Sequence, residues 1–466
     1  MSAPRTWHSM LGTVFVCLVL GLATYWGTIW VLQASSHSES SQELVELDES
    51  IVQEPDPYLA DLRAAAQIVR ERWSYGEHRA QISGLDLAAL EQTAVALLGD
   101  QPDNHTFKLA LTYFIAGLKD GHAFVSTPEH TLAAKHRWPF SLVEVAEGIM
   151  VHGVQADLPR PKPGDLLRTI DGVAIEKFIS KAEHQVFAST DLSRRHQAIQ
   201  FMCKWDTNPE REFGFESADA KQFAVSSSLP PYYQTIMTPT LISKERRHRM
   251  LENGVAYFCP GNFSPPTDSG WPGPPEKRDA ILADTYAEFD RIIGELAQCR
   301  ALILDLRHNP GGTDLLGQFL VDRLVDPGYI YFQLSSDFGM DWLNFGKHKS
   351  TAAKGENSIR APLICLIDER TFSTADNVAA CLADVHPNVR FVGRPNGAGT
   401  GAPRPFELPR TGATIHFCTM RVRTPNGRMG EGLSIPLTET VTWTRDDVLQ
   451  LRDPDLQKAL DLLDPN

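Results

Sequence analysis

Two nearly unbroken apolar runs, 301–306 and 363–367, constrain the fold of this chain more than any other feature. Strands that are buried on both faces have this composition, whereas half-exposed strands alternate apolar and polar residues. A helical pattern precedes the first run at 278–298, and another follows the second run at 374–384. Because helices that alternate with buried strands cover the faces of a sheet, the sequence predicts an α/β domain over residues 250–445.

The residues on either side of this domain have different patterns. Apolar residues recur at helical spacing over 58–130, which predicts an N-terminal helical domain. Short alternating strands and turns follow over 136–230, which predicts a β-rich domain. Residues 446–466 are expected to form a C-terminal helical tail. The Pro- and Gly-rich stretch 264–275 is predicted to be a surface loop or a lid.

The N-terminus carries one segment that is not globular. Residues 10–33 hold a run of 23 uncharged, mostly apolar residues, long enough to cross a hydrocarbon core of about 30 Å. The flank at 1–9 contains Arg5, whereas the linker at 34–57 has seven acids and no Lys or Arg. The positive-inside rule then predicts a single-pass membrane anchor, with the N-terminus in the cytoplasm and the rest in the periplasm or outside the cell. A cleaved signal peptide is the alternative, but its apolar core is usually shorter.

Charge and cysteine spacing argue against nucleic-acid binding and structural zinc. The formal net charge is −14 and no dense stripe of Lys or Arg is present, so the surface repels phosphate backbones. None of the seven cysteines belongs to a Cys-x-x-Cys or Cys/His cluster. We therefore expect no metal, no cofactor and mostly buried thiols. A disulfide is compatible with the predicted compartment, but its pairing cannot be read from the sequence.

The first stretch with chemical potential is the end of the first apolar run. It continues directly into Asn309-Pro310-Gly311-Gly312. Adjacent glycines let the backbone approach a ligand closely, and their N–H groups can point outward together to stabilise an oxyanion. The structural alternative is a strand-to-helix turn that uses glycine only for its positive φ.

The second stretch lies where the other apolar run turns into a helix, with Ser373 at the junction. A serine at a helix start lies near the positive end of the helix dipole, which favours a developing negative charge. The structural alternative is a capping box, because Asp376 follows three positions later.

Together, these stretches resemble the C-terminal-processing (tail-specific) serine peptidases. The motifs that carry the resemblance are Asp305-Leu306-Arg307-His308-Asn309-Pro310-Gly311-Gly312, Ser373-Thr374-Ala375-Asp376, Gly393-Arg394-Pro395, Thr424-Pro425-Asn426-Gly427-Arg428 and Glu431-Gly432-Leu433-Ser434-Ile435-Pro436. They follow the family's order between about residues 60 and 445. The segment 163–173, which ends in an Asp-Gly turn, is similar to a PDZ domain and lies where the family places one.

The resemblance implies a fold and a set of site residues. The α/β domain is expected to have a crotonase/ClpP-like protease fold, beside the PDZ-like domain and the N-terminal helical segment. Ser373 is expected to be the nucleophile, with the oxyanion held by backbone N–H groups of Gly311 or Gly312 and of Thr374. The residues expected to support the site are Asp305, Arg307, Asn309 and Asp376.

One departure from the family decides which general base to expect. The best-known branch uses a lysine after the Gly-x-Pro motif, but the first lysine after Ser373 here is Lys458. A second branch, similar to the tricorn core protease, takes a histidine from the helical segment and a glutamate from the late turn. His122 and Glu431 stand at those positions, so the resemblance implies a Ser-His-Glu triad. His308 beside the glycine pair is a rival base.

The resemblance implies a serine endopeptidase that cleaves peptides or partly unfolded, C-terminally tagged proteins. Peptides would dock on the PDZ-like domain by adding a strand to the edge of its sheet. The alternatives are an inactive relative that binds peptides or other ligands, and an esterase or thioesterase on the same fold. Phe263 and Trp271 are candidates for lining the substrate. The oligomeric state cannot be read from the sequence.

Overall fold

A computed structural model of the chain describes residues 45–128, 136–155, 159–205, 210–227, 242, 245–265, 275–336, 343–345 and 358–464. The predicted membrane anchor at 10–33 lies outside these residues, and so does most of the predicted loop or lid at 264–275. Within the described ranges, none of the helices combines the length and the apolar character that a membrane crossing requires.

The α/β region is built on a central sheet, which has six strands among the described residues. They are β10 (Arg247–Met250), β11 (Val255–Cys259), β12 (Ala301–Asp305), β15 (Leu363–Ile367), β16 (Val389–Gly393) and β20 (Glu439–Thr440), in the spatial order β10-β11-β12-β15-β16-β20. All pairs from β11 to β20 are parallel, and β10 closes one edge in the antiparallel sense. The two apolar runs are the paired central strands β12 and β15, which confirms the predicted α/β architecture.

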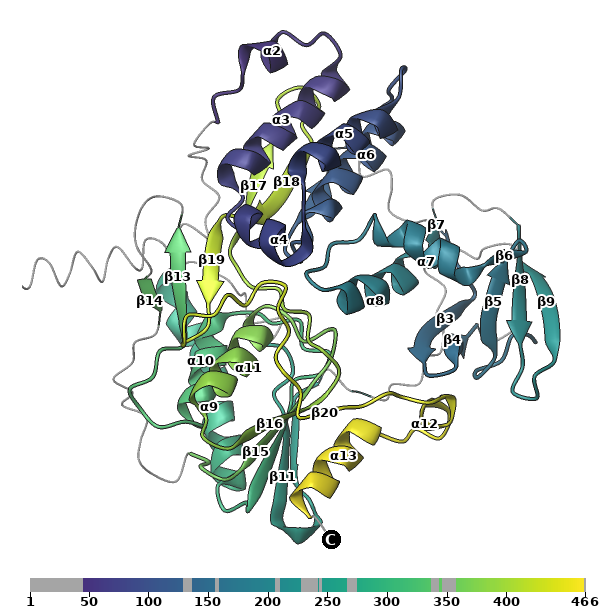
Figure 1. Cartoon of the computed structure of the whole chain (residues 1–466). Helices are drawn as coiled ribbons and strands as arrows, with labels where there is room; N and C mark the ends of the chain where they lie inside the picture. Colours follow the sequence, from purple (N-terminus) through teal and green to yellow (C-terminus); the bar gives the residue numbers. More distant parts are fainter. Residues whose placement is uncertain are drawn as a thin grey trace, which may run out of the picture.

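Helices cover both faces of this sheet (Figure 1). α9 (Pro275–Leu296), α10 (Asp314–Asp322) and α11 (Thr374–Val385) share one apolar core with Leu304 and Cys365. α13 (Pro454–Leu463) packs on the opposite face, in a core with Ile303 and Leu366. Because neighbouring residues of a strand point to opposite faces, both cores draw on the same short apolar runs.

The core of the N-terminal helical region includes two strands from late in the chain. Its helices are α2 (Glu49–Val52), α3 (Pro57–Arg72), α4 (Gly76–Ser83), α5 (Leu87–Leu98) and α6 (Asn104–Gly117). They pack on a sheet of β1 (Phe124–Ser126), β18 (Thr414–Cys418) and β17 (Pro403–Glu407). Figure 1 shows β17 and β18 among the purple helices. Residues 403–418, which the sequence analysis assigned to the α/β domain, therefore complete the helical core.

The β-rich region is an antiparallel sheet with two helices beside it. Its strands are β3 (Phe140–Val145), β4 (Gly148–Val154), β5 (Leu166–Ile170), β8 (Arg211–Glu216) and β9 (Gln222–Ser227), in that spatial order, with β6 (Val173–Ala174) paired to β5. α7 (Ile175–Glu183) and α8 (Asp191–Phe201) share its apolar core. The region also contains a small antiparallel pair of strands, β2 (His136–Arg137) and β7 (Lys204–Trp205).

The remaining elements connect these regions. β19 (Met420–Arg423) pairs with β13 (Phe332–Ser336), which also pairs with β14 (Leu343–Phe345). The short 3-10 turn η1 (Glu252–Gly254) precedes β11, and α12 (Arg445–Leu449) precedes α13. β18 and β19 are separated only by residue 419, yet the two strands join different sheets.

Candidate active site

Ser373 lies on the turn between β15 and α11, at the N-cap position of the helix. Its backbone is in the left-handed region, with φ 58° and ψ −123°, and its side chain makes no capping hydrogen bond. A non-glycine residue in this region is strained, and such strain persists only where the surroundings enforce it. Here the Ser373 N–H donates to Gly399 O at 3.0 Å. The capping-box alternative does not hold, and the hydroxyl is turned out of the helix end.

His122 reaches this hydroxyl from the other side of the site. The turn that follows α6 carries it, and its Nε2 lies 3.1 Å from Ser373 Oγ. The sequence alone does not determine this distance, because 251 positions separate the two residues. The ring is tilted against Phe372, with centroids 4.6 Å apart. Burial lowers the pKa of His122, and the nearby Asp120 carboxylate opposes that shift, so the imidazole is held as a neutral proton acceptor.

Asp120 is the acid nearest to this histidine, and the sequence analysis missed it. The carboxylate is buried and accepts hydrogen bonds from His122 N and Trp73 Nε1, at 2.9 and 3.1 Å. It also accepts from Cys418 N at 2.9 Å and from Cys418 Sγ at 3.4 Å. The signal that could have found it is its place in the turn, two residues before the histidine and directly after the helix.

Glu431 lies in the same buried region. Within the described part of the chain, its carboxylate makes no hydrogen bond to the His122 imidazole. Its Oε1 accepts from Arg79 Nη2 at 2.6 Å and its Oε2 from Thr400 N at 2.8 Å. Burial raises the pKa of Glu431 to about 7, Arg79 opposes that shift and Asp120 adds to it. The expected role of Glu431 as the direct partner of His122 therefore needs correction, because both oxygens are taken up by other donors.

The oxyanion donors also differ from the expectation in one respect. The Gly311 N–H donates to Asn309 Oδ1 at 2.9 Å, so it is not directed at a substrate. Gly311 instead provides space, because a Cβ at this position would lie 2.7 Å from Thr374 N and from the Ser373 side chain. Within the described residues, the Gly312 and Thr374 N–H groups donate to no protein acceptor. These two amides are the ones free to meet an oxyanion.

Two of the expected supporting residues brace the turns around Ser373. Asn309 accepts at its backbone oxygen from Phe372 N at 3.0 Å, and its Nδ2 donates to Gly261 O at 2.6 Å. Asp376 accepts from Asn396 Nδ2 at 2.6 Å and from Gly399 N at 2.8 Å. Burial raises the pKa of Asp376 to about 8. Asp376 thus holds the loop whose Gly399 carbonyl accepts the Ser373 N–H.

The other two expected supporting residues, Asp305 and Arg307, lie deeper. Arg307 forms a bidentate pair with Asp305, through Nε at 2.9 Å and Nη2 at 2.7 Å. The same guanidinium binds Asp453 and Asp455, which stand at the start of α13. Arg307 therefore anchors the C-terminal helix under the strand that leads to the glycine pair.

Three further candidates from the sequence are placed away from the reacting atoms or not described. His308 Nε2 lies 3.1 Å from the buried Asp368 carboxylate, so this ring contacts an acid of its own rather than Ser373. Phe263 is wholly buried in the α/β core, so the prediction that it lines the substrate is wrong. Trp271 lies outside the described residues. None of the six cysteines in the described part of the chain forms a disulfide, and five of them are buried.

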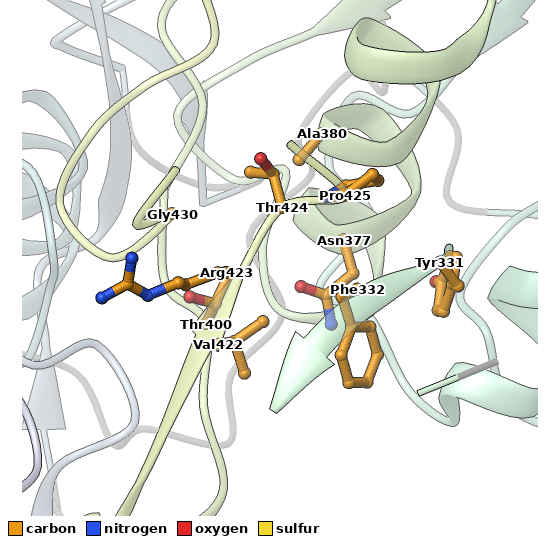
Figure 2. Close-up of a pocket in the computed structure, with 10 residues that line it drawn as sticks. All are labelled: Tyr331, Phe332, Asn377, Ala380, Thr400, Val422, Arg423, Thr424, Pro425 and Gly430. Atoms are coloured by element: carbon orange, nitrogen blue, oxygen red, sulfur yellow. The ribbon is translucent and has the colours of Figure 1, made fainter. Parts of the chain in front are cut away.

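A small pocket lies beside the buried Glu431, between α11, β13 and β19 (Figure 2). It is lined by Tyr331, Phe332, Asn377, Ala380, Thr400, Val422, Arg423, Thr424, Pro425 and Gly430. Thr400 connects it to the site, because Thr400 N donates to Glu431.

Solved structures with a similar fold exist. The chain is similar to mature CPAF in complex with lactacystin, with a TM-score of 0.68 and 16% identity over 87% of this chain and 97% of that one. Another structure of mature CPAF gives a TM-score of 0.67 at 16% identity over 87% and 96% of the two chains. The photosystem II D1 C-terminal processing protease is similar with a TM-score of 0.43 and 15% identity over 83% and 94%. No curated protein matches the chain in sequence.

Residues 277–439 match the model of peptidase family S41. This chain contains a peptidase family S41 domain. The S41 domain is that of a serine-type peptidase, which confirms the resemblance drawn from the motifs. Ser373, the glycine pair and Glu431 lie inside the matched residues, whereas His122 and Asp120 come from the helical region that precedes the S41 domain.

Proposed function

We propose that this chain is a serine endopeptidase that cleaves peptide bonds through an acyl-enzyme, with Ser373 as the nucleophile and His122 as the general base. The observation that carries the proposal is the 3.1 Å contact between His122 Nε2 and Ser373 Oγ. A serine hydroxyl is a weak nucleophile until a neighbouring base accepts its proton, and a distance of about 2.6–3.2 Å permits that transfer.

The proposed steps follow from this contact. Ser373 Oγ attacks the scissile carbonyl carbon while His122 Nε2 takes the hydroxyl proton. The N–H groups of Gly312 and Thr374 stabilise the oxygen of the tetrahedral intermediate. His122 then gives its proton to the leaving amine, and the C–N bond breaks to leave an ester on Ser373. Water, deprotonated by the same imidazole, hydrolyses that ester and restores the serine.

Two buried acids support the imidazolium that forms in these steps. Asp120 is the carboxylate whose charge raises the pKa of His122. Glu431 adds a second negative charge when it is ionised, and Arg79 favours that ionised form. We therefore assign Asp120 the closer electrostatic role and Glu431 a second one, in a Ser-His-acid arrangement of the tricorn-like type.

We further propose that peptides dock on the β-rich region in the manner of a PDZ domain. β3 is an edge strand of its sheet, and α8 packs beside it. An extended peptide can add to such an edge as a further strand, next to α8. The substrates would then be peptides or partly unfolded proteins with an accessible C-terminus.

The location of the reaction is proposed from sequence alone. The uncharged run at 10–33 and the acidic segment after it support an N-terminal anchor with the peptidase domain outside the cytoplasm. Protease protection of the domain in intact cells, lost when the outer barrier is opened, tests this placement.

Active-site labelling tests the proposal. A fluorophosphonate probe should label the wild-type chain and the matched Ser50→Ala control, and it should not label Ser373→Ala. Hydrolysis of a tailed peptide should fall by about three orders of magnitude or more in Ser373→Ala and in His122→Ala. The exposed His105→Ala variant should keep wild-type activity. Equal labelling of wild type and Ser373→Ala would refute the assignment.

The alternatives give different results in the same assay. A non-catalytic binding protein would bind the peptide without turnover and would not react with the probe. An esterase or thioesterase would react with the probe and hydrolyse nitrophenyl esters, but it would leave casein and tailed peptides intact.

A further inference from the structure

A cluster of three potential metal ligands lies against the candidate active site. Asp120, His122 and Cys418 each offer one ligand atom, and these atoms all lie within 4.8 Å of one another. Two come from the turn after α6 and the third from the end of β18, so the cluster joins segments almost 300 positions apart. The sequence analysis expected no metal because these residues do not form a local motif.

The geometry of the cluster leaves one ligand atom without a partner. His122 Nε2 faces Ser373 Oγ, whereas Nδ1 is buried and makes no hydrogen bond within the described part of the chain. Asp120 does not satisfy this nitrogen, because its carboxylate already accepts from His122 N, Trp73 Nε1 and Cys418. A buried polar atom without a partner is costly, so a ligand that binds Nδ1 would be favoured.

The chemistry of the three side chains selects the ligand. One imidazole, one thiol and one carboxylate are the donors that Zn²⁺ takes in proteins, whereas Mg²⁺ and Ca²⁺ prefer oxygen ligands alone. With bonds of about 2.0–2.3 Å, the donors around a tetrahedral zinc lie roughly 3.3–3.8 Å apart. Cys418 Sγ and Asp120 Oδ1 are already 3.4 Å apart.

Local charge agrees with a divalent cation. Asp120 forms no ion pair within the described part of the chain, because the nearby Arg79 pairs with Glu431 instead. A Zn²⁺ ion would give the buried Asp120 carboxylate an opposite charge, and uncompensated charge in a protein interior is unfavourable.

We propose that Asp120, His122 Nδ1 and Cys418 form an inhibitory zinc site, with water as the fourth ligand. Binding displaces the thiol proton of Cys418 to solvent. A neutral imidazole that gives its Nδ1 lone pair to zinc carries its remaining proton on Nε2. That proton faces Ser373 Oγ, so the ring cannot accept the serine proton and the enzyme is silent until the metal leaves. This consequence for activity rests on the proposed function, whereas the binding of the metal does not.

Cobalt absorption tests the site without reference to activity. Purified full-length chain should bind one Co²⁺ per chain with a near-ultraviolet thiolate-to-cobalt band, and Zn²⁺ should abolish that band. The band should disappear in Cys418→Ser and persist in Cys203→Ser, a matched cysteine variant in the β-rich region. It should also persist in Ser373→Ala. The absence of the band from the wild-type chain would overturn the proposal, whatever the stability of the variants.

Inhibition is measured separately with the fluorophosphonate probe. Zn²⁺ should block labelling of the wild type, and a chelator should restore it. Cys418→Ser should need at least about tenfold more Zn²⁺, because even loss of an outer-shell partner costs about that much affinity. Equal zinc sensitivity of the wild type and Cys418→Ser would overturn the site. A cobalt band in a chain that reacts with no probe under any condition would uphold the site and refute the proposed function instead.

Discussion

The two buried acids of the site, Asp120 and Glu431, do not act on the imidazole of His122 in the same way. Asp120 is close enough to raise the pKa of the ring, whereas Glu431 is tied to Arg79 and Thr400. Opposite charges near a titrating group stabilise its charged form, and this holds for a transient imidazolium as well. The proton affinity of the catalytic ring is therefore set mainly by Asp120 and by burial.

This assignment predicts the effect of Asp120→Asn. Loss of the carboxylate charge makes the imidazolium less stable, so the pKa of His122 should fall further and the acid limb of kcat/KM should move to lower pH. The plateau value of kcat/KM should drop by at least about tenfold, since a lost interaction of about 1.4 kcal/mol gives that factor. Steady-state kinetics between pH 4 and 9 measure both. An acid limb that moves to higher pH would contradict the assignment.

The buried pair of Arg79 and Glu431 gives a second residue-scale prediction. Both side chains are almost wholly buried, and Arg79 also donates to Ser189 O at 3.0 Å. Arg79→Met leaves the carboxylate without its counter-charge, and breaking one side of a buried pair typically costs about 3–5 kcal/mol. Urea unfolding should show a loss of this order. The double variant Arg79→Met/Glu431→Gln should recover part of it, and no recovery would contradict the pairing.

The sequence was enough to nominate Ser373, His122 and the glycine pair, because each stands in a short motif that the family shares. It was not enough to nominate Asp120 or to exclude the Gly311 amide. Asp120 gains its meaning from Cys418 and Trp73, which approach it only in the folded chain. The Gly311 N–H is lost to Asn309 Oδ1, a local hydrogen bond that depends on backbone angles no motif records.

Among the secondary-structure elements, the turn before α11 depends on tight packing around Phe372. A Cβ at Gly399 would lie 1.8 Å from the Phe372 ring, and one at Gly121 would lie 2.6 Å from it. These two glycines allow the ring to fit between the histidine turn and the loop that holds Ser373 N. The ring thus keeps the two catalytic turns at a fixed separation.

α8 and the edge strand β3 carry a prediction about peptide docking. Gln200 of α8 donates from Nε2 to the Leu142 backbone oxygen of β3 at 3.0 Å. A peptide that adds to this edge needs the same backbone group, so it must displace Gln200. Gln200→Ala should therefore tighten binding of a C-terminal peptide, by about two- to tenfold for one part-buried hydrogen bond.

Fluorescence anisotropy on the catalytically silent Ser373→Ala background measures this affinity. Gln197→Ala is the matched control, because it shortens the same kind of side chain on the same helix. Weaker binding in Gln200→Ala than in Gln197→Ala would show that the peptide uses the glutamine rather than competes with it.

Element prediction succeeded where burial dictates the pattern and failed where it does not. β15 has the predicted bounds because the five consecutive apolar residues 363–367 have few alternatives to a buried strand. α8 was missed because its sequence is rich in polar residues, although Arg194 and Ser193 are buried in the fold. β17 was missed because prolines at 403 and 405 demote a strand to an edge, which is the place it occupies.

At the scale of the molecule, the segment that leads into α8 and the helix itself bring all three regions together. Ser189 Oγ accepts from Gly121 N beside the histidine, and Arg194 donates to Ala116 O of the helical region. His196 Nδ1 lies 3.3 Å from Glu369, four residues before the nucleophile. The β-rich region is therefore fastened to both catalytic turns.

The buried acids of the site also set how the stability of the whole chain depends on pH. Burial raises the pKa of Asp376 to about 8 and that of Glu431 to about 7. In the unfolded chain both groups lose their protons well below these values, so the folded state holds more protons between pH 6.5 and 8. Stability must then fall as pH rises, at up to about 1.4 kcal/mol per pH unit for each group. Histidines whose pKa is lowered, such as His122 and His416, act in the opposite direction only at lower pH.

Asp376→Asn separates this effect from all others. The substitution should lower the free energy of unfolding at every pH. Asp376 accepts hydrogen bonds from two donors, Gly399 N and Asn396 Nδ2, whereas the new asparagine must turn its own NH₂ donor towards one of them. It also removes one titrating group, so the decline in the free energy of unfolding between pH 6.5 and 8 should become shallower by up to about 1.4 kcal/mol per pH unit. Asp191→Asn, at an exposed site on α8, should leave the slope unchanged. Urea unfolding at half-unit pH steps measures both slopes, and parallel curves for wild type and Asp376→Asn would mean that Asp376 is already ionised in the folded enzyme.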